Sequence, residues 1–420
     1  MHNSQFTIHN DSQAVPLPFP KGEGQGWGLQ PMHNSPFILR NVTTLLVLLL
    51  ALVSCREEVE IFIPEEVEVT QPEYTSVTGF FLLNEANMGS NDCSLDYYDY
   101  AKGKYFRNYY ASRNPSVVKD LGDVGNDIGI YGSKMYAVIN CSNKVEVMDL
   151  KARRIGQVDV PNCRYIKFHG GYAYLTSYAG PVAASFDGSY KQHGYVAKID
   201  TTTLQVVDTC VVGFQPDQLD IVGGKIYVAN SGGYMVPNYE NTLSVIDLET
   251  FSEVERIPIA INLHHCIADH RGILWVSSRG DYGNTPSRLY AYDTRKNRLV
   301  QSLDVAVSNL WMDGDSLYII GNQWSNITQT NDKSYAIVNT RTMEVVSDRF
   351  VTDGTDEQIT LPYGVAVNPI TKDIYVTDAK DYLTPGRLYC FGSDGIKKWD
   401  VLTGYIPAHF VFIGENINEH

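Results

Sequence analysis

A short pattern of residues recurs six times after residue 120, and it restricts the folds open to this chain more than any other feature. Each copy has an apolar run containing an aromatic residue, then a loop, then a second apolar run, which closes on Asp or Asn in all but the last copy. The first runs are Met135–Val138, Ala173–Leu175, Ile226–Ala229, Leu274–Val276, Leu317–Ile320 and Ile374–Val376. The second runs are Val145–Asp149, Tyr195–Asp200, Leu243–Asp247, Leu289–Asp293, Tyr335–Asn339 and, in weaker form, Leu388–Gly392. The repeat interval of roughly 40 to 55 residues is the length of a four-stranded sheet with its turns. The pattern therefore predicts an all-β fold, a β-propeller.

Each repeat contains the other strands of a blade. A further apolar run precedes the aromatic run across a tight turn, as at Gly170-Gly171, and an alternating edge strand such as Gln205–Val207 follows the second run. Short runs rich in β-branched and aromatic residues, separated by Gly and Asp, are typical of antiparallel strands. We expect the aromatics of the repeated runs to pack between blades; these are Tyr136, Tyr174, Tyr227, Tyr318 and Tyr375.

The two ends of the chain supply the parts of one more blade. Phe80–Asn84 and Leu95–Asp99 match the second and third strands of a repeat, but no first strand precedes them. Ala408–Phe412 resembles a first strand, and nothing follows it to complete a blade. We therefore predict a seven-bladed ring closed by a blade that the termini share, which removes the exposed edge of an open sheet stack.

The segment before the ring predicts where the protein works. Leu45–Val53 is too short an apolar stretch to span a bilayer as a helix but suits a signal peptide. Leu52–Cys55 resembles the bacterial lipobox, which implies lipidation of Cys55. The acidic pair Glu57-Glu58 after it resembles the surface-export signal of Bacteroidota lipoproteins. We expect an outer-membrane lipoprotein exposed on the cell surface.

These features divide the chain into four parts. Residues 1–31 read as a mis-annotated or disordered leader, because a complete signal peptide begins at Met32. Residues 32–54 form that signal peptide, residues 55–77 an acidic tether that is flexible or extended, and residues 78–420 the propeller.

Composition excludes several classes of function. The formal net charge is −15, and residues 1–54 hold two acidic and two basic side chains, so the mature part keeps the whole excess. This acidity disfavours a nucleic-acid partner.

The cysteines and the missing motifs limit the chemistry of the chain. Of seven cysteines, six follow Cys55, and their spacing is not that of metal ligands. We expect mostly buried thiols, although Cys141 and Cys163 could bridge neighbouring blades. Nucleotide-binding and hydrolase motifs are missing from the sequence, so we expect no cofactor, no metal and no enzyme activity.

The longest loops identify one face of the ring as functional. They join second to third strands, and on a propeller they emerge beside the entries to the first strands. Rigid aromatics and oriented polar groups in these loops and entries predict a small-molecule binding surface. The predicted ligand-binding residues are Asn126, Asp127, Arg164, Tyr165, Tyr178, Asp217, Gln218, Tyr234, Tyr239, His264, His265, Arg279, Asp281, Tyr282, Trp311, Trp324, Tyr363, Tyr382 and His409.

The adjacent histidines His264 and His265 are the most enzyme-like local feature of the sequence. With His409 and a carboxylate they could form a base or a metal site, because neutral imidazole suits both roles. However, neighbours on a strand point to opposite faces, so at most one of the pair is expected to face the ring axis. No third ligand stands at a telling interval.

The repeat also carries a family resemblance. Ile226–Asn230 followed by Leu243–Asp247 resembles the YVTN repeat of YncE-like propellers, and the likeness extends over about residues 78–415. Together with the lipobox, the chain resembles propeller lipoproteins of Bacteroidota, one branch of which captures cobalamin for a TonB-dependent transporter of the outer membrane. The resemblance implies a corrinoid ligand, such a transporter as partner, and contact with the membrane through the lipid anchor.

Other functions remain open at this stage. A structural or adhesive surface protein would also carry the anchor, but it does not need a clustered aromatic face. Glycan binding would use the same face. A propeller lyase or lactonase would need a cluster of inward-facing His, Asp and Glu side chains, for which His264, His265 and His409 are the only indication.

Overall fold

A computed structural model of the chain describes residues 65–414 except 74, 118–120, 183–188, 190–191 and 326–329, and its account of side chains also omits residues 323–331. The predicted leader, signal peptide, Cys55 and residues 55–64 of the tether lie outside the described residues and stay predictions.

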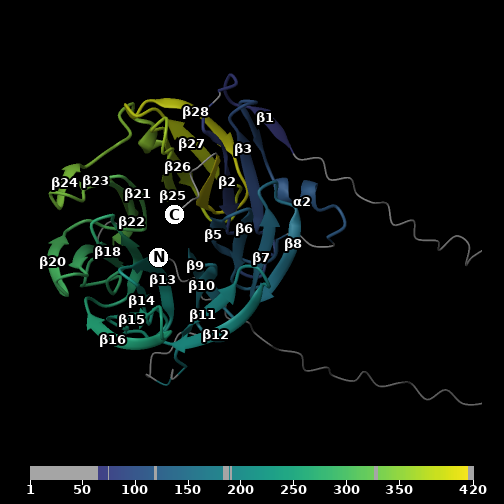
Figure 1. Cartoon of the computed structure of the whole chain (residues 1–420). Coiled ribbons are helices and arrows are strands. Elements are labelled where there is room, and N and C mark those ends of the chain that lie inside the picture. Colours follow the sequence, from purple (N-terminus) through teal and green to yellow (C-terminus); the bar gives the residue numbers. More distant parts are fainter. Residues whose placement is uncertain are drawn as a thin grey trace, which may run out of the picture. The chain divides into compact units, whose positions relative to one another are not determined.

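Seven antiparallel sheets form a ring, as the sequence predicts (Figure 1). The first strands of successive sheets contact one another around the axis, so they are the innermost strands. Six blades are consecutive in sequence: β5 (Gly125–Tyr131), β6 (Lys134–Ile139), β7 (Lys144–Asp149), β8 (Arg154–Asp159); β9 (Cys163–His169), β10 (Tyr172–Ser177), β11 (Tyr195–Asp200), β12 (Gln205–Val211); β13 (Pro216–Val222), β14 (Lys225–Asn230), β15 (Thr242–Asp247), β16 (Ser252–Pro258); β17 (Leu263–Ala268), β18 (Ile273–Ser278), β19 (Arg288–Asp293), β20 (Arg298–Leu303); β21 (Asn309–Asp313), β22 (Ser316–Ser325), β23 (Thr330–Asn339), β24 (Glu344–Ser347); and β25 (Pro362–Val367), β26 (Ile374–Asp378), β27 (Arg387–Phe391), β28 (Lys397–Leu402).

The seventh blade, here called the closing blade, joins the two ends of the chain. Its order is β29, β2, β3, β4 and β1, with bounds Pro407–Gly414, Val77–Asn84, Ser94–Asp99, Lys104–Phe106 and Glu66–Glu68. Phe81 pairs with Val411 and Leu83 with His409 in the antiparallel β2–β29 ladder. The predicted closure through Ala408–Phe412 is therefore confirmed. Two short helical segments, α2 (Tyr109–Arg113) and the 3-10 turn η1 (Thr355–Glu357), lie in connections before first strands.

The fifth strand β1 is a feature that the sequence did not predict. Its residue Glu66 pairs with Phe106, which places the end of the tether on the outer edge of the closing blade. Glu66 also accepts a hydrogen bond from the Lys104 ammonium at 2.9 Å, and Glu65 accepts one from Arg107 at 2.6 Å. The acids of this part of the tether are thus ion-pair partners as well as solvated charges.

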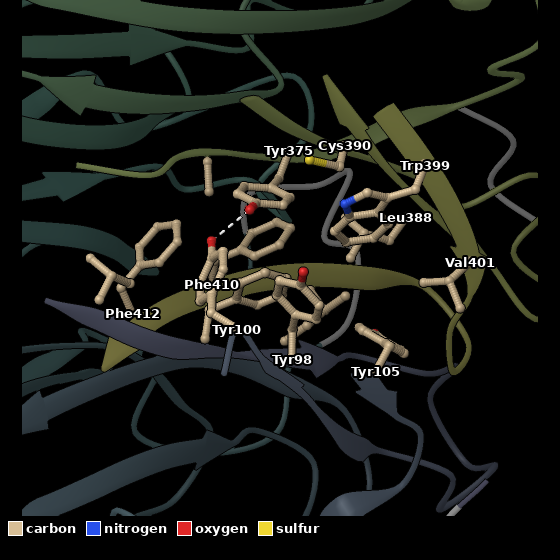
Figure 2. Packing of buried hydrophobic residues seen from close by; sticks show 14 residues of the cluster. Tyr98, Tyr100, Tyr105, Tyr375, Leu388, Cys390, Trp399, Val401, Phe410 and Phe412 are labelled. Carbon is tan, nitrogen blue, oxygen red and sulfur yellow. Dashed lines mark hydrogen bonds between the residues drawn. The ribbon is translucent and has the colours of Figure 1, made fainter. Parts of the chain in front are cut away.

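The apolar core lies between neighbouring blades. Figure 2 shows one such interface, where Tyr375 of β26 and Trp399 of β28 face aromatic residues of the closing blade. The Tyr375 and Tyr100 hydroxyls are 2.5 Å apart, and both side chains are almost completely buried. Five of the six aromatics of the repeated runs are buried in this way, namely Tyr136, Tyr174, Tyr227, Trp275 and Tyr375, whereas Tyr318 is half-buried.

The two faces of the ring differ as expected. First and second strands are joined by two-residue turns in four of the six blades that are consecutive in sequence, and by longer turns between β17 and β18 and between β25 and β26. At Gly170-Gly171 both residues have positive φ, 59° and 86°, which glycine adopts without strain. The opposite face carries the connections from second to third and from fourth to first strands. We call it the long-loop face, and it holds the predicted binding residues.

The six described cysteines are free thiols, so the alternative of a Cys141–Cys163 bridge is not found. Five are buried, and burial raises the pKa of Cys163 to about 12, while Cys141 is half-buried. They act as small apolar core residues.

Candidate functional site

A recurring β-bulge places side chains at the axis on the long-loop face. In β9, Arg164 and Tyr165 together oppose the single residue Thr176 of β10, because the register shifts between Leu175 and Ser177. The Tyr165 amide donates to the Thr176 hydroxyl at 3.0 Å, which holds the extra residue in place. A bulge re-aims side chains at the end of a strand. The same shift occurs at the start of β13, β17 and β25.

The bulge in β17 changes the expected arrangement of His264 and His265. Both residues oppose Ser277, whose hydroxyl accepts the His265 amide at 2.9 Å. The two imidazole rings therefore lie side by side, with centroids 3.9 Å apart. Strict alternation would have put the two rings on opposite faces of the strand, and the bulge removes that alternation at this point. The expectation that at most one of them faces the axis stays a prediction.

The carboxylate of Asp217 holds together what we call the arginine wall, formed by Arg164, Tyr178, Asp217 and Arg279. Asp217 is fully buried and accepts the Tyr178 hydroxyl at 2.6 Å and Arg279 Nη1 at 2.8 Å, while Arg164 Nε lies at 3.4 Å. The Arg164 guanidinium also stands over the Tyr178 ring, 4.9 Å from its centroid. Three neighbouring blades contribute to this wall.

Burial and charge keep the wall in one protonation state. Burial alone would lower the pKa of Arg164 and Arg279, but Asp217 and the surrounding tyrosines raise both above their usual values. Burial raises the pKa of Tyr178 well above its usual range. Both guanidinium groups are therefore charged and the phenol is neutral at any ordinary pH.

His264 and Tyr165 lie next to the wall. The Tyr165 hydroxyl is 2.9 Å from His264 Nε2, and Nδ1 of the same ring is buried without a hydrogen-bond partner among the described residues. Burial, reinforced by the charge of Arg279, lowers the pKa of His264 well below its usual value. Burial also lowers the pKa of His265 to about 4. The two rings are neutral at physiological pH.

A second group, here called the acidic side, comes from β25 and the closing blade. Glu85 accepts the Tyr363 hydroxyl at 2.7 Å and lies 2.8 Å from His409 Nε2. The Tyr363 ring is 5.9 Å from the Tyr382 ring. Burial raises the pKa of Tyr165 most, and the charges of Asp217 and, to a smaller extent, Glu85 raise it further. Tyr165 thus couples the arginine wall electrostatically to the acidic side. The arginine wall, Tyr165, His264 and the acidic side together are called the axial site.

Glu85 is the residue of this site that the sequence prediction missed. It is the first residue after β2, and Tyr178 and Arg279 are the first residues after β10 and β18. Comparing equivalent positions of the repeat would therefore have found it.

Four predicted residues instead bind neighbouring blades together. Asn126 donates to the Arg164 carbonyl at 2.9 Å, and Asp127 accepts the amide of the next blade's Ile166 at 2.9 Å. Gln218 accepts the Cys266 amide at 2.9 Å, and His265 Nε2 contacts the Ser308 carbonyl at 3.0 Å. These hydrogen bonds join successive blades, and a role of the four residues in ligand binding stays a prediction.

The remaining predicted residues lie in the long loops or pack against the core, and Tyr382 of the acidic side is among the exposed ones. Tyr234 and Tyr382 are 44% and 39% exposed, while Tyr239 is half-buried. Asp281 accepts the amides of its own loop and thereby shapes the segment that carries Tyr282. Trp311 packs on Phe412, with ring centroids 5.7 Å apart, and the Trp324 side chain lies outside the described residues.

The described part of the chain also has a pocket away from the axial site. A pocket of about 500 Å³ lies on the opposite face, between the β9–β12 and β13–β16 blades, and is lined by Tyr172, Lys198 and Lys225 among others. It contains none of the predicted residues. Within the described ranges, no His, Cys, Asp and Glu side chains gather in a group able to hold a metal ion. No helix of the described residues is long and apolar enough to cross a membrane.

The comparisons with known proteins agree with the fold. Residues 78–413 match the family described as "Domain of unknown function (DUF5074)", a description that assigns no reaction. A comparison with curated proteins gives no match. Among solved structures, the chain is similar to a proposed 6-phosphogluconolactonase from Bacteroides fragilis, at 12% identity and TM-score 0.55 over 82% of this chain and 100% of the other.

Two further structures are similar at the same level. A hypothetical selenium-binding protein from Sulfolobus tokodaii has 9% identity and TM-score 0.56, with 80% of this chain and 93% of the other covered. A quinonprotein alcohol dehydrogenase-like protein from Bacteroides thetaiotaomicron has 14% identity and TM-score 0.51, with 81% and 79% covered. Identities this low establish a shared fold and nothing about ligands.

Proposed function

We propose that this chain, which belongs to the DUF5074 family, is a surface lipoprotein. Its propeller would capture a bulky organic ligand on the long-loop face. The leading candidate for the ligand is a corrinoid, and the recipient would be a TonB-dependent transporter of the outer membrane.

The observation that carries this proposal is the convergence of the axial site. Side chains from five of the seven blades meet there, although they come from positions as distant in sequence as Glu85 and His409. A fold that used this face only as a structural surface would not need two charged arginines and a neutral histidine gathered in it. Ligand sites combine aromatic area with a few oriented polar groups in this way.

An exposed apolar rim extends the site outward. Met88 and Leu383 are 81% and 74% exposed, and Tyr382 lies beside Leu383 in the same loop. The Asn87 side-chain amide donates to the Tyr382 carbonyl, which joins the two loops of the rim. Gathered apolar side chains in water mark surfaces that become covered on binding. A corrinoid presents a broad ring with a fringe of amides, which matches an apolar rim around a polar centre.

Direct titration tests the proposal. The full chain carrying Cys55→Ala, so that no lipid is attached, is titrated with cyanocobalamin and with cobinamide by calorimetry and absorbance. We expect saturable binding, weakened by Tyr234→Ala and by Tyr382→Ala because exposed aromatics that become buried typically contribute about 2 kcal/mol each. Tyr172→Ala on the opposite face is the matched control and should leave the affinity unchanged. Absence of any heat or spectral change with both compounds would exclude the corrinoid and leave other ligands, including glycans, to be screened.

The anchor is tested separately in intact cells. Replacement of Cys55 by Ala should move the protein from the membrane to the soluble fraction, because the thiol is the proposed acylation point. Replacement of Glu57 and Glu58 by Ala should keep it membrane-bound but hide it from surface labelling, since the acids are the proposed export signal. Equal surface labelling of the Glu57→Ala/Glu58→Ala variant and the unchanged protein would remove the export proposal.

A further inference from the structure

We infer that the axial site anchors its ligand through one anionic oxygen group, a carboxylate or a phosphate, held between Arg164 and Arg279. This inference rests on the proposed function, because it names the chemistry recognised by the same site. It makes no use of the corrinoid candidate.

The charges of the arginine wall do not cancel. Arg164 and Arg279 carry two positive charges, and Asp217 is the single carboxylate within 4.0 Å of either guanidinium among the described residues, which leaves a net charge of +1. Asp217 is fully buried, whereas the two arginine side chains remain 19% and 22% exposed. The uncompensated charge therefore lies on the solvent side of the wall.

Most of the guanidinium donors have no partner among the described residues. An arginine has five N–H groups, and the described contacts use only Nε of Arg164 and Nη1 of Arg279. The exposed parts of the two side chains, 19% for Arg164 and 22% for Arg279, are where N–H groups can donate to an entering oxygen. Parallel N–H groups of this kind match carboxylate and phosphate geometry.

Two buried polar atoms beside the wall lack partners in the described structure. Nδ1 of His264 is one, on a ring that is 9% exposed and linked to Tyr165 by its other nitrogen. Nε2 of Gln215 is the other; this fully buried side chain stands two residues before Asp217 and accepts the Tyr234 amide with its oxygen at 2.7 Å. Buried polar groups nearly always have partners in a complete structure. Nε2 of Gln215 is a donor, and Nδ1 of His264 is a donor in the tautomer in which Nε2 accepts the Tyr165 hydroxyl. Donors next to a net positive charge suit an acceptor-rich anion.

The rest of the protein limits the kind of anion. The whole chain carries a formal charge of −15, and Glu85 stands on the other side of the axial site. A polyanion would be repelled by this field. One negative group on a larger ligand, otherwise neutral, meets the local +1 charge without that penalty.

The experiment compares arginine variants with several probes. Arg164→Gln and Arg279→Gln are made in the full chain with Cys55→Ala, with Arg256→Gln as the matched control, since Arg256 pairs with Glu253 on an outer edge strand. The probes are inorganic phosphate, succinate, cyanocobalamin, which contains a phosphodiester, and cobinamide, which does not. Circular dichroism and thermal unfolding identify any variant that fails to fold.

We expect phosphate or succinate to raise the thermal midpoint of the unchanged protein and of Arg256→Gln, but not of either axial variant. The anion that acts distinguishes a phosphate from a carboxylate. If corrinoids bind, cyanocobalamin should lose about tenfold or more in affinity with Arg279→Gln, as expected for a charge-assisted hydrogen bond, and cobinamide should lose much less.

The outcomes separate this inference from the proposed function. Corrinoid binding that is insensitive to both arginine variants, with no effect of phosphate or succinate, would overturn the anionic anchor and leave capture standing. An arginine-dependent effect of phosphate or succinate, with no corrinoid binding, would support the anchor and exclude the corrinoid. Arginine variants that do not fold are replaced by Arg164→Lys and Arg279→Lys, which keep the charge but remove the paired N–H geometry. Unchanged anion effects in these variants would also overturn the proposed geometry.

Discussion

Truncation of the chain after Gly404 should abolish the closed ring. The deletion removes β29, which pairs with β2 from Val77↔Gly414 to Asn84↔Pro407. It also removes Phe410 and Phe412, whose rings lie 5.6 and 5.8 Å from that of Phe80. Each buried phenylalanine contributes about 1.5–3 kcal/mol to the free energy of unfolding, and the uncovered edge of β2 becomes a site for aggregation.

Thermal unfolding by circular dichroism and size-exclusion chromatography measure this effect. We expect aggregation or a loss of the cooperative transition, because the closing blade would lack its innermost strand. Truncation after Gly414 is the control, since it removes residues 415–420 and spares β29. A chain ending at residue 404 that stays monomeric and unfolds at the original temperature would show that closure through the termini is dispensable.

Asp217→Ala should be the most damaging single substitution in the axial site. It leaves the charges of Arg164 and Arg279 without their shared carboxylate and the Tyr178 hydroxyl without its acceptor. Removal of one partner from a buried charged group typically costs about 3–5 kcal/mol. The free energy of unfolding, measured by chemical denaturation, should fall by an amount of this order.

Two comparisons show whether charge is the cause. Asp208→Ala removes an exposed carboxylate whose described hydrogen bond is to the amide of Thr209, and it should change the stability by little. Asp217→Asn keeps an acceptor of similar size, so it should destabilise less than Asp217→Ala. Equal losses for Asp217→Ala and Asp208→Ala would mean that the wall does not depend on its carboxylate.

The fold was predictable because the sequence repeats one pattern of apolar runs and turns for each blade. Every blade repeats the same apolar pattern, and the missing first strand before Phe80 has one counterpart, at Ala408–Phe412. Elements outside the repeat were not predicted. β1 is three residues long and acidic, and its pairing with β4 depends on partners such as Lys104 that lie 38 residues away. The short helix α2 likewise lies in the connection between β4 and β5, a segment that the repeated pattern does not cover.

The axial site was predictable in part. The rule that entries and long loops share a face correctly brought together Arg164, Asp217 and Arg279. The β-bulge could not be predicted, because the sequence does not show that two residues oppose one, and so the close contact of the His264 and His265 rings was not foreseen. The partners of Asn126 and Gln218 are backbone groups of the next blade. Such contacts depend on how two blades sit against each other, which a pattern within one blade does not encode.

The added strand β1 would have a mechanical consequence if the chain is anchored through Cys55 as proposed. It is hydrogen-bonded to the outermost strand of the closing blade, and its flank is held by Lys104 and Arg107. A pull applied through the N-terminal segment would be borne first by these three residue pairs of backbone and by ion pairs open to water. Detachment of β1 would lengthen the tether by several residues, each spanning about 3.3 Å when extended, while the β2–β29 ladder stayed intact. The pairing of β1 with β4 can thus break under a pulling force before the ring opens.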